Sequence, residues 1–498
     1  IIATDGGGSG GIVYDVLTDT NLVGTTKTAA LTNAGALSNQ GTVTVGVDDT
    51  GYDVKFFGAT SGAYMLWDES ADDLKLVGAA GLTVAGDIST PSAGTSNFRA
   101  GVNAGNSIAS GGNYNVAIGD EAGTAISTGD QNVFVGYASG DATTTGSYSV
   151  AIGANALTNN TTGRNVAIGT DSLGTCTTGS NNTGLGDSTL YALTTATDNV
   201  AVGASAGDAI TTGNLNVAVG RNALGINTTG DYNTAIGGSS LDANTTADNN
   251  TAVGYSSLGV NTTGTPNTAV GFRAMDANTT GGSNTAVGYD ALGANTTAIN
   301  NTAVGTNALL VSTTGASNTA VGSEALAANT TAANNTAVGK SALTANTTGA
   351  NNVAVGQAAQ AATTTGNDNV GIGRQALDAN TTGGANVAIG SDALGANTTA
   401  SNNTAVGYQA LLLNTTGTQN ASFGSYSMDV NTTGGNNAAF GHAALNTNST
   451  GDHNTSIGAG SLAAATTADN NTAVGSASLS ANTTGAGNVA VGLSALAA

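Results

Sequence analysis

Side chains that could act as nucleophiles, bases or metal ligands are few in this sequence. There are two histidines, His442 and His453, and one cysteine, Cys176. The histidines lie at different positions of a repeated unit, and no cysteine or carboxylate cluster stands beside them at the spacing of metal ligands. Cys176 replaces an asparagine of the same repeat, so we interpret it as a tolerated small residue rather than a nucleophile. A single cysteine also excludes an intrachain disulfide framework.

Carboxylates are concentrated in one short segment near the N-terminus. Calcium prefers such oxygen ligands, but no loop there follows the pattern D-x-D-x-D-G, and we interpret the side chains as solvated carboxylates of turns. Glycoside hydrolysis would need a carboxylate pair in a cleft with aromatic side chains, and the repeated region offers neither. The sequence therefore predicts a protein that is not an enzyme and has no catalytic residue, cofactor or metal site. The acidic residues of the segment are Asp48, Asp49, Asp53, Asp68, Glu69, Asp72 and Asp73.

The charge balance restricts the partners of the chain. It carries 31 acidic and nine basic residues, a formal net charge of -22 over 498 residues. An acidic chain without a basic cluster repels nucleic acid and anionic membranes. No apolar run approaches the roughly 18 residues of a membrane span. We expect no nucleic-acid partner and no membrane span.

A glycine that closes the triplet A-V-G or A-I-G marks a tandem repeat, and we call it the marker glycine. It occurs at Gly119, Gly136, Gly153 and Gly169, and then at every seventeenth position to Gly492; only the step from Gly153 to Gly169 is shorter, by a single position. Self-similarity at a short fixed period is typical of a solenoid, in which each coil buries its apolar side chains against its neighbours. The sequence predicts an all-β chain built as a parallel β-solenoid with 17-residue coils.

Each coil contains a three-residue strand and a second apolar anchor. An aliphatic or aromatic residue directly precedes the marker glycine. A small residue, usually Ala, stands two positions before the glycine, and Val or Thr stands three positions before it. In most coils Leu or Met stands four positions after the glycine. Alternation over three residues indicates a strand with two faces. If Val or Ile points into the coil, Ala points out, and a column of exposed methyl groups permits another chain to approach. We therefore expect Ala269, Ala286 and Ala303 to face a partner chain.

A polar bend, N-T-T-G or N-T-T-A, connects the anchor to the asparagine before the next strand. Residues at one position of a stacked coil form a column, so the asparagine amides can hydrogen-bond to the coils above and below. The N-T-T triplets also match the N-glycosylation pattern, which the repeated bend explains. A threonine array that binds ice usually has T-x-T on one strand face, whereas adjacent threonines point to opposite faces. The bend is predicted to be structural.

The N-terminal part differs from the repeats. Residues 1–41 resemble a connector or attachment arm, and residues 42–90 alternate short strands with Gly and Asp turns, which predicts a small antiparallel β-meander. Residues 91–118 form a transition and residues 119–498 the rod. Gly123, Gly140 and Gly207 occupy the Leu position of early coils; adaptation of the rod to the preceding domain and simple repeat drift both explain this. Because the chain begins at Ile1 without a signal-peptide core and ends at Ala498 in mid-pattern, we expect a processed chain or part of a longer one.

Two stretches resemble known families. The motifs N-T-A-V-G and N-V-A-I-G resemble the repeats of the YadA-like heads of trimeric autotransporter adhesins over roughly residues 100–498, although the repeat of that family is shorter and lacks the N-T-T-G bend. The segment GVDDTGYDVKFFGATSGAYMLWDESADDLKL resembles a module of virion and tail-fibre proteins of tailed, marine-type bacteriophages. The first resemblance implies a left-handed parallel β-roll in a homotrimer. The second implies a phage fibre.

Together these features favour a mechanical function. We expect a homotrimeric β-solenoid fibre of a phage virion, such as a tail fibre, that contacts other virion proteins at its N-terminal end and projects an element that recognises a host-cell receptor. The alternative is a bacterial cell-surface adhesin or extracellular filament subunit of the trimeric autotransporter type. The expected location is the virion or, for the alternative, the bacterial cell surface.

Overall fold

The computed structural model describes residues 54–57, 64–68, 73–77 and 92–497. The chain divides into two compact units, residues 1–88 and 89–498. The described residues contain β-strands and turns, and no helix that could cross a membrane occurs among them. This confirms the all-β prediction.

The strands are β1 (Val54–Phe57), β2 (Tyr64–Asp68), β3 (Asp73–Val77), β4 (Phe98–Ala100), β5 (Val116–Ile118), β6 (Val133–Val135), β7 (Val150–Ile152), β8 (Val166–Ile168), β9 (Thr183–Leu185), β10 (Val200–Val202), β11 (Val217–Val219), β12 (Thr234–Ile236), β13 (Thr251–Val253), β14 (Asn267–Val270), β15 (Asn284–Val287), β16 (Thr302–Val304), β17 (Thr319–Val321), β18 (Thr336–Val338), β19 (Val353–Val355), β20 (Val370–Ile372), β21 (Val387–Ile389), β22 (Thr404–Val406), β23 (Ala421–Phe423), β24 (Ala438–Phe440), β25 (Thr455–Ile457), β26 (Thr472–Val474) and β27 (Val489–Val491).

The first unit contains a three-stranded antiparallel sheet in the order β1-β2-β3. Val54 pairs with Trp67, and Tyr64 pairs with Val77. The predicted antiparallel meander is therefore confirmed for these three strands. The connector at residues 1–41 and the turns of the meander lie outside the described residues.

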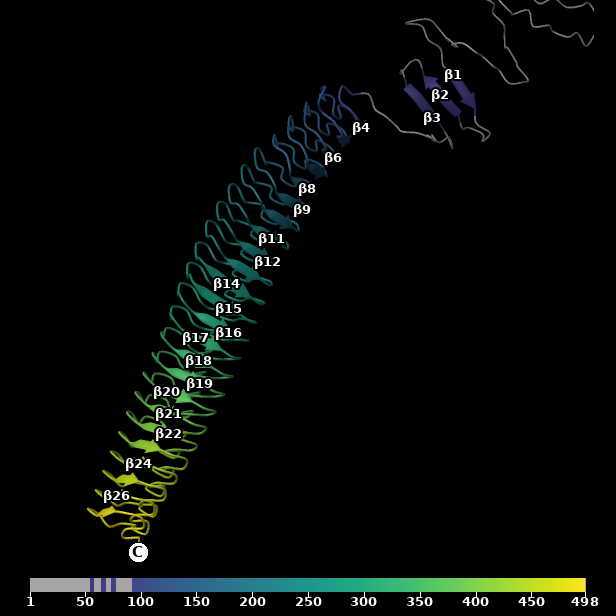
Figure 1. The fold of residues 1–498 in the computed structure, drawn as a ribbon. Helices are drawn as coiled ribbons and strands as arrows, with labels where there is room; N and C mark the ends of the chain where they lie inside the picture. Colours follow the sequence, from purple (N-terminus) through teal and green to yellow (C-terminus); the bar gives the residue numbers. More distant parts are fainter. Residues whose placement is uncertain (1–53, 58–63, 69–72, 78–91, 498) are drawn as a thin grey trace, which may run out of the picture. The chain divides into compact units, whose positions relative to one another are not determined.

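The second unit is a stack of coils, each of which contributes one short strand to a single parallel sheet (Figure 1). Successive strands pair at the same position of the repeat, so Ala269 lies beside Ala286, and Ala286 beside Ala303. The predicted parallel β-solenoid with 17-residue coils is confirmed. Strand β4, in the segment described above as a transition, pairs with β5, so the stack includes this segment from Phe98 onward. The left-handed coil and the homotrimer stay predictions.

In most coils the core is formed by the strand alanine, the leucine four residues after the marker glycine and the alanine just before that leucine. Ala269, Ala286 and Ala303 are completely buried, as is Leu292. The prediction that these alanines face outward is wrong: it is Val287, the aliphatic residue before the glycine, that remains 36% exposed. Because one coil is thin, only a small side chain fits between the strand and the leucine behind it in the coils that have this leucine. The larger residues of the strand are directed to the opposite face.

The marker glycine is required for two independent reasons. At Gly288 the backbone has φ +140°, a conformation that side chains rarely permit, and an added Cβ would lie 2.5 Å from the carbonyl oxygen of Gly305 in the next coil. Four residues later Leu292 adopts the left-handed conformation with φ 54°. Its amide donates to Ala308 O of the next coil at 2.9 Å, so a hydrogen bond between coils accompanies this unusual turn.

Two columns of buried asparagine side chains connect the coils, and the sequence predicted the one that precedes the strand. Before the strand, Asn284 Nδ2 donates to Ala298 O at 2.8 Å, and its Oδ1 accepts the backbone N–H of Asn301 at 2.9 Å. In the bend, Asn295 Nδ2 donates to Asn278 Oδ1 at 2.7 Å. These bonds satisfy polar groups that would be costly to bury unpaired, and they fix the register of adjacent coils.

The structure explains the glycines of the early coils. Phe134 of β6 occupies the position of the strand alanine and is completely buried, and its ring lies beside Gly140 and Gly123, where other coils have leucine. An added Cβ would approach its ring to 2.6 Å at Gly140 and 2.8 Å at Gly123. In a later coil, an added Cβ at Gly207 would lie 3.0 Å from Ile210 Cδ1. The large side chains compensate for the missing leucines, so the early coils differ in composition but not in packing.

Candidate functional site

The most extensive surface with a distinctive chemistry is the outward face of the solenoid strands, which we call the strand face. It consists of two residues in each strand from β5 to β27: the residue just before the marker glycine and the residue three positions before that glycine. Ile236 is 40% exposed, Val338 37% and Phe440 40%. These apolar side chains lie in register along the stack because the strands pair residue by residue.

The strand face carries no charge from β5 to β27, although the chain as a whole carries a formal charge of -22. The residue before the glycine is Val, Ile, Leu or Phe, and the residue two positions earlier is Val, Thr or Ala. Phe423 and Phe440 stack on one another with ring centres 4.8 Å apart. Soluble monomers rarely expose a continuous apolar surface of this size, and such surfaces usually mark an interaction site.

The same face bears on the proposal of ice binding. Strands β12 to β18 place Thr beside Val or Ile on the outward face, as in Thr251 and Val253, and no described strand has threonine at both outward positions. In the bend, Thr245 Oγ1 donates to Thr262 O of the next coil at 3.2 Å, and Thr246 is exposed. The two adjacent threonines therefore differ in environment, as the sequence indicated, and a regular T-x-T array does not occur among the described strands.

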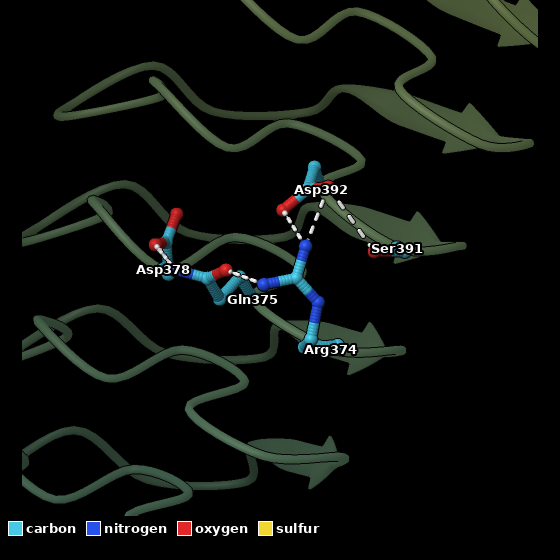
Figure 2. Close-up of polar contacts among 5 residues, drawn as sticks. All are labelled: Arg374, Gln375, Asp378, Ser391 and Asp392. Atoms are coloured by element: carbon cyan, nitrogen blue, oxygen red, sulfur yellow. Dashed lines mark hydrogen bonds and ion pairs between the residues drawn. The ribbon is translucent and has the colours of Figure 1, made fainter.

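Charged side chains lie in the turn that follows the marker glycine. Figure 2 shows Arg374 reaching Asp392 of the next coil, with Nη2 and Oδ2 3.2 Å apart, while Ser391 Oγ donates to the same carboxylate oxygen at 3.1 Å. Arg374 also donates to Gln375 Oε1, and Gln375 Nε2 donates to Asp378 Oδ2 at 3.4 Å. Arg374 is more than half exposed, so the contribution of this pair to stability is small. The cluster joins neighbouring coils and presents no cleft.

Several aspartates of this turn are half-buried. Burial raises the pKa of the Asp242 carboxyl above its ordinary value, and burial together with the charge of Asp392 raises the pKa of Asp378. In the adjacent coil the same repeat position is often occupied by glycine. At Gly225 an added Cβ would lie 2.4 Å from Asp242 Oδ1. The glycine therefore leaves space for the carboxylate of the neighbouring coil. No group of three metal-ligating side chains occurs among the described residues.

Exposed aromatic residues form a short column directly after three successive marker glycines. The rings of Tyr255 and Phe272 have centres 5.6 Å apart, and those of Phe272 and Tyr289 are 5.5 Å apart and nearly parallel. The rings lie one above another and remain 57%, 45% and 50% exposed for Tyr255, Phe272 and Tyr289. The column therefore adds contact between coils.

The chemically reactive residues named from the sequence do not form a site. Cys176 is buried, and its sulfur accepts a hydrogen bond from Asn160 Nδ2 at 3.2 Å. Burial raises the pKa of the Cys176 thiol to about 11, so the thiol is protonated and inert at neutral pH. His442 lies edge-on to Tyr426 at 6.0 Å, and His453 is exposed in a separate turn.

The acidic residues of the meander are only partly described. Asp68 and Asp73 are paired across strands β2 and β3, and their side chains lie outside the described residues. Asp48, Asp49, Asp53, Glu69 and Asp72 also lie outside them. The interpretation of these residues as turn carboxylates stays a prediction.

The bend asparagines of the N-T-T triplets are buried in the stack. Asn244 is fully buried, and its Nδ2 donates to Asn227 Oδ1 at 2.8 Å and to Ala247 O at 3.1 Å. A glycan on this nitrogen would remove these bonds and would require the coil to open. The folded solenoid therefore conceals the acceptor atom of these N-glycosylation patterns.

The sequence did contain a signal for the strand face. The middle strand position is small in nearly every coil, whereas the position before the glycine varies from Val to Phe, as in Val406 and Phe423. Tolerance of different sizes indicates an open side, and restriction to small residues indicates a confined one. Hydrophobicity alone would direct the larger residue inward, whereas side-chain volume directs the smaller residue inward.

Comparisons with known proteins add no relative: no family model, no curated protein and no solved structure matches this chain.

Proposed function

We propose that the chain is the rod of a structural fibre in which three copies associate through their strand faces. The observation that supports this most directly is the uncharged, partly exposed aliphatic column from β5 to β27. The chain carries charged residues in its turns, whereas the strand face is both uncharged and largely apolar. Association between copies would remove the surface from water, which is favourable in proportion to the apolar area buried.

The size of the strand face fits a stable interface. Each strand from β5 to β27 presents two partly exposed residues. Together they offer an area on the order of 1,000 Å², compared with the roughly 800 Å² per partner of a standard interface. The coils are also thin, and in most of them a single leucine is the only large side chain at the centre. Burial of the strand face would add an apolar layer that a single coil lacks.

The favoured setting is a phage virion. At a spacing of about 4.8 Å per strand, the stack from β5 to β27 would be about 110 Å long, and a rod of this kind can hold a host-recognition element away from the particle. The support for the virion comes from the resemblance of residues 46–76 to a phage fibre module. In this setting the N-terminal part contacts other virion proteins and a receptor is bound distally.

A bacterial adhesin of the trimeric autotransporter type is the second candidate, because the N-T-A-V-G repeats resemble those of its head. The two settings predict different genes around the coding sequence. Capsid and tail genes beside it favour the virion fibre, whereas a C-terminal stalk and membrane anchor in the same gene favour the adhesin.

The test of association uses matched lysine variants. The test variant replaces three strand-face residues together by Lys: Val287, Val321 and Val338, each 36–37% exposed. The control variant replaces three exposed bend residues of the same region by Lys: Thr280, Thr314 and Thr331. Multi-angle light scattering and negative-stain imaging give the mass and the shape. We expect a trimeric rod for the unmodified chain and the control, and loss of trimer for the valine variant.

Two results would contradict the proposal. A monomeric unmodified chain would leave the strand face free for another ligand. A trimer that persists in the valine variant would place the interface elsewhere on the coil.

A further inference from the structure

The single 16-residue coil creates a local irregularity on the bend side of the solenoid. In the flanking coils Tyr148 and Asn181 stand just before the asparagine or serine that leads into the strand, and Arg164 has the same position in the short coil. All three have left-handed backbone conformations, with φ 65°, 59° and 66° for Tyr148, Asn181 and Arg164. The missing residue therefore belongs between Gly163 and Arg164.

The missing residue leaves an open recess of about 430 Å³. Gly163 closes up against Ser147, where an added Cβ would lie 2.0 Å from the carbonyl oxygen, and Arg164 N donates to Ser147 O at 2.9 Å. Residues from three successive coils line the recess, among them Thr145, Ser147, Tyr148, Arg164, Ser180 and Asn181. The recess is shallow and open to solvent, so a ligand would contact it along one side.

The deletion also removes a position that can cap the N–H of Ser147, although the N–H of Ser180 in the next coil is likewise uncapped in the described part of the chain. One coil earlier, Asp130 N donates to Ser147 Oγ at 2.9 Å, and Asn113 N donates to Asp130 Oδ1 at 2.7 Å. The side chain that would cap the N–H of Ser147 in the same way belongs to the missing residue. Among the described residues no hydrogen bond to the Ser147 N–H is present. A ligand oxygen in the recess could accept it.

Arg164 is the charged group of the recess and has no carboxylate partner among the described residues. Its guanidinium carbon lies 5.9 Å from the centre of the Tyr148 ring, which is 57% exposed. The comparable recess beside Val260 and Val311 contains Arg273, but Arg273 is paired with Asp276 at 2.7 Å. Arg164 therefore differs from Arg273 in having its guanidinium available to an anionic ligand, on a chain with a formal charge of -22.

We propose that this recess binds a carboxylated sugar, such as a uronic acid unit of a surface glycan. The guanidinium of Arg164 matches a carboxylate in charge and in geometry. The exposed ring of Tyr148 offers an apolar surface to the C–H groups of a sugar ring, and Asn181, Thr145 and Ser180 offer partners for its hydroxyl groups. The site lies in columns separate from the strand face, so a fibre of three copies would carry three of them.

Binding is tested on the full chain with trigalacturonate as the probe. Uncharged galactotriose and inorganic phosphate at equal ionic strength serve as comparisons, and isothermal titration calorimetry measures the affinity. We expect Arg164→Gln to weaken trigalacturonate binding about tenfold or more, because a hydrogen bond to a charged group is lost, and Arg164→Lys to retain part of the affinity. Arg221→Gln is the matched control, since Arg221 is also exposed and has no ion pair among the described residues but lies in a coil of ordinary length.

A second variant tests the recess itself. Insertion of Ser between Gly163 and Arg164 restores the 17-residue period, supplies a cap for the Ser147 N–H and keeps the arginine; we expect it to abolish binding. Absence of trigalacturonate binding, equal binding of galactotriose, displacement by phosphate alone, or full binding by the insertion variant would each overturn the proposal.

The glycan site rests on the proposed fibre and adds a ligand on the lateral surface of the rod. Glycan binding and trimer formation can fail separately. Light scattering on the same samples reports whether the rod assembles. An intact trimer without glycan binding overturns the inference alone, and a monomer that binds trigalacturonate overturns the proposed association alone.

Discussion

The packing of Phe134 can be tested by exchanging its ring for the leucine that other coils contain. In the variant Phe134→Ala, Gly140→Leu the coil acquires the usual pair of a strand alanine and a leucine four residues after the glycine, as in Ala303 and Leu309. Leu309 has φ 52°, and Gly140 already has φ 61°, so leucine fits the backbone at this position.

The expected magnitudes follow from the contacts. Phe134→Ala alone should cost about 3 to 5 kcal/mol, because the ring is completely buried and leaves a cavity. Gly140→Leu alone should cost about 1 to 3 kcal/mol, because its Cβ would lie 2.6 Å from the ring of Phe134. The double variant should lose only about 1 to 2 kcal/mol, since the ring and the leucine compete for one space and the left-handed backbone penalises Leu relative to Gly.

Amide hydrogen exchange in the full chain is the appropriate assay, because a solenoid opens locally rather than as one unit. The reporters are the amides of Val133, bonded to Ser149 O at 2.9 Å, and Gly123, bonded to Ser139 O at 2.8 Å. The amide of Val353, far along the stack, is the control and should not change. If the two single effects simply add in the double variant, the proposed compensation between Phe134 and Gly140 is refuted.

Three further predictions concern single residues. Gly288→Ala should lower the free energy of unfolding of its coil by about 1 to 3 kcal/mol or more, because its φ is +140° and the new Cβ would meet a backbone oxygen at 2.5 Å. Gly238→Ala is the control and should be tolerated, since the nearest atom to its Cβ would be 3.6 Å away. Thermal unfolding compares the two variants. Cys176 should resist thiol reagents at pH 8 in the folded chain and should react when the chain is denatured. Its folded pKa is raised from 9.0 to about 11. The contribution of its protonated thiol to stability is therefore fully present below pH 9 and is lost as the pH rises from 9 to 11. Rapid labelling of the native thiol would contradict this. Burial raises the pKa of Asp242, so the folded state binds the proton more tightly and gains stability as the pH falls through the raised pKa. Asp242→Asn should therefore raise the free energy of unfolding at pH 7, and this gain should disappear in acid. Urea titrations at the two pH values measure the difference.

The candidate sites could be predicted only in part. The inertness of Cys176 and the buried amide columns follow from repeat position, since a residue that replaces a bend asparagine occupies the same buried place. The recess at Arg164 was foreshadowed by the 16-residue step, but a deletion does not say which position of the coil it removes. That required the backbone alignment of Tyr148, Arg164 and Asn181.

The sequence by itself determined the architecture. A 17-residue period, a three-residue strand and a fixed glycine restrict the chain to a stack of coils, because each unit is too small to bury its own apolar residues. The asparagine column before the strand followed as well, since equal positions in stacked coils must lie side by side. Only the tertiary structure decided which face of the strand is inside. Alternation defines two faces without saying which is buried, and here the narrow space between strand and leucine admits Ala269 and directs Val270 outward.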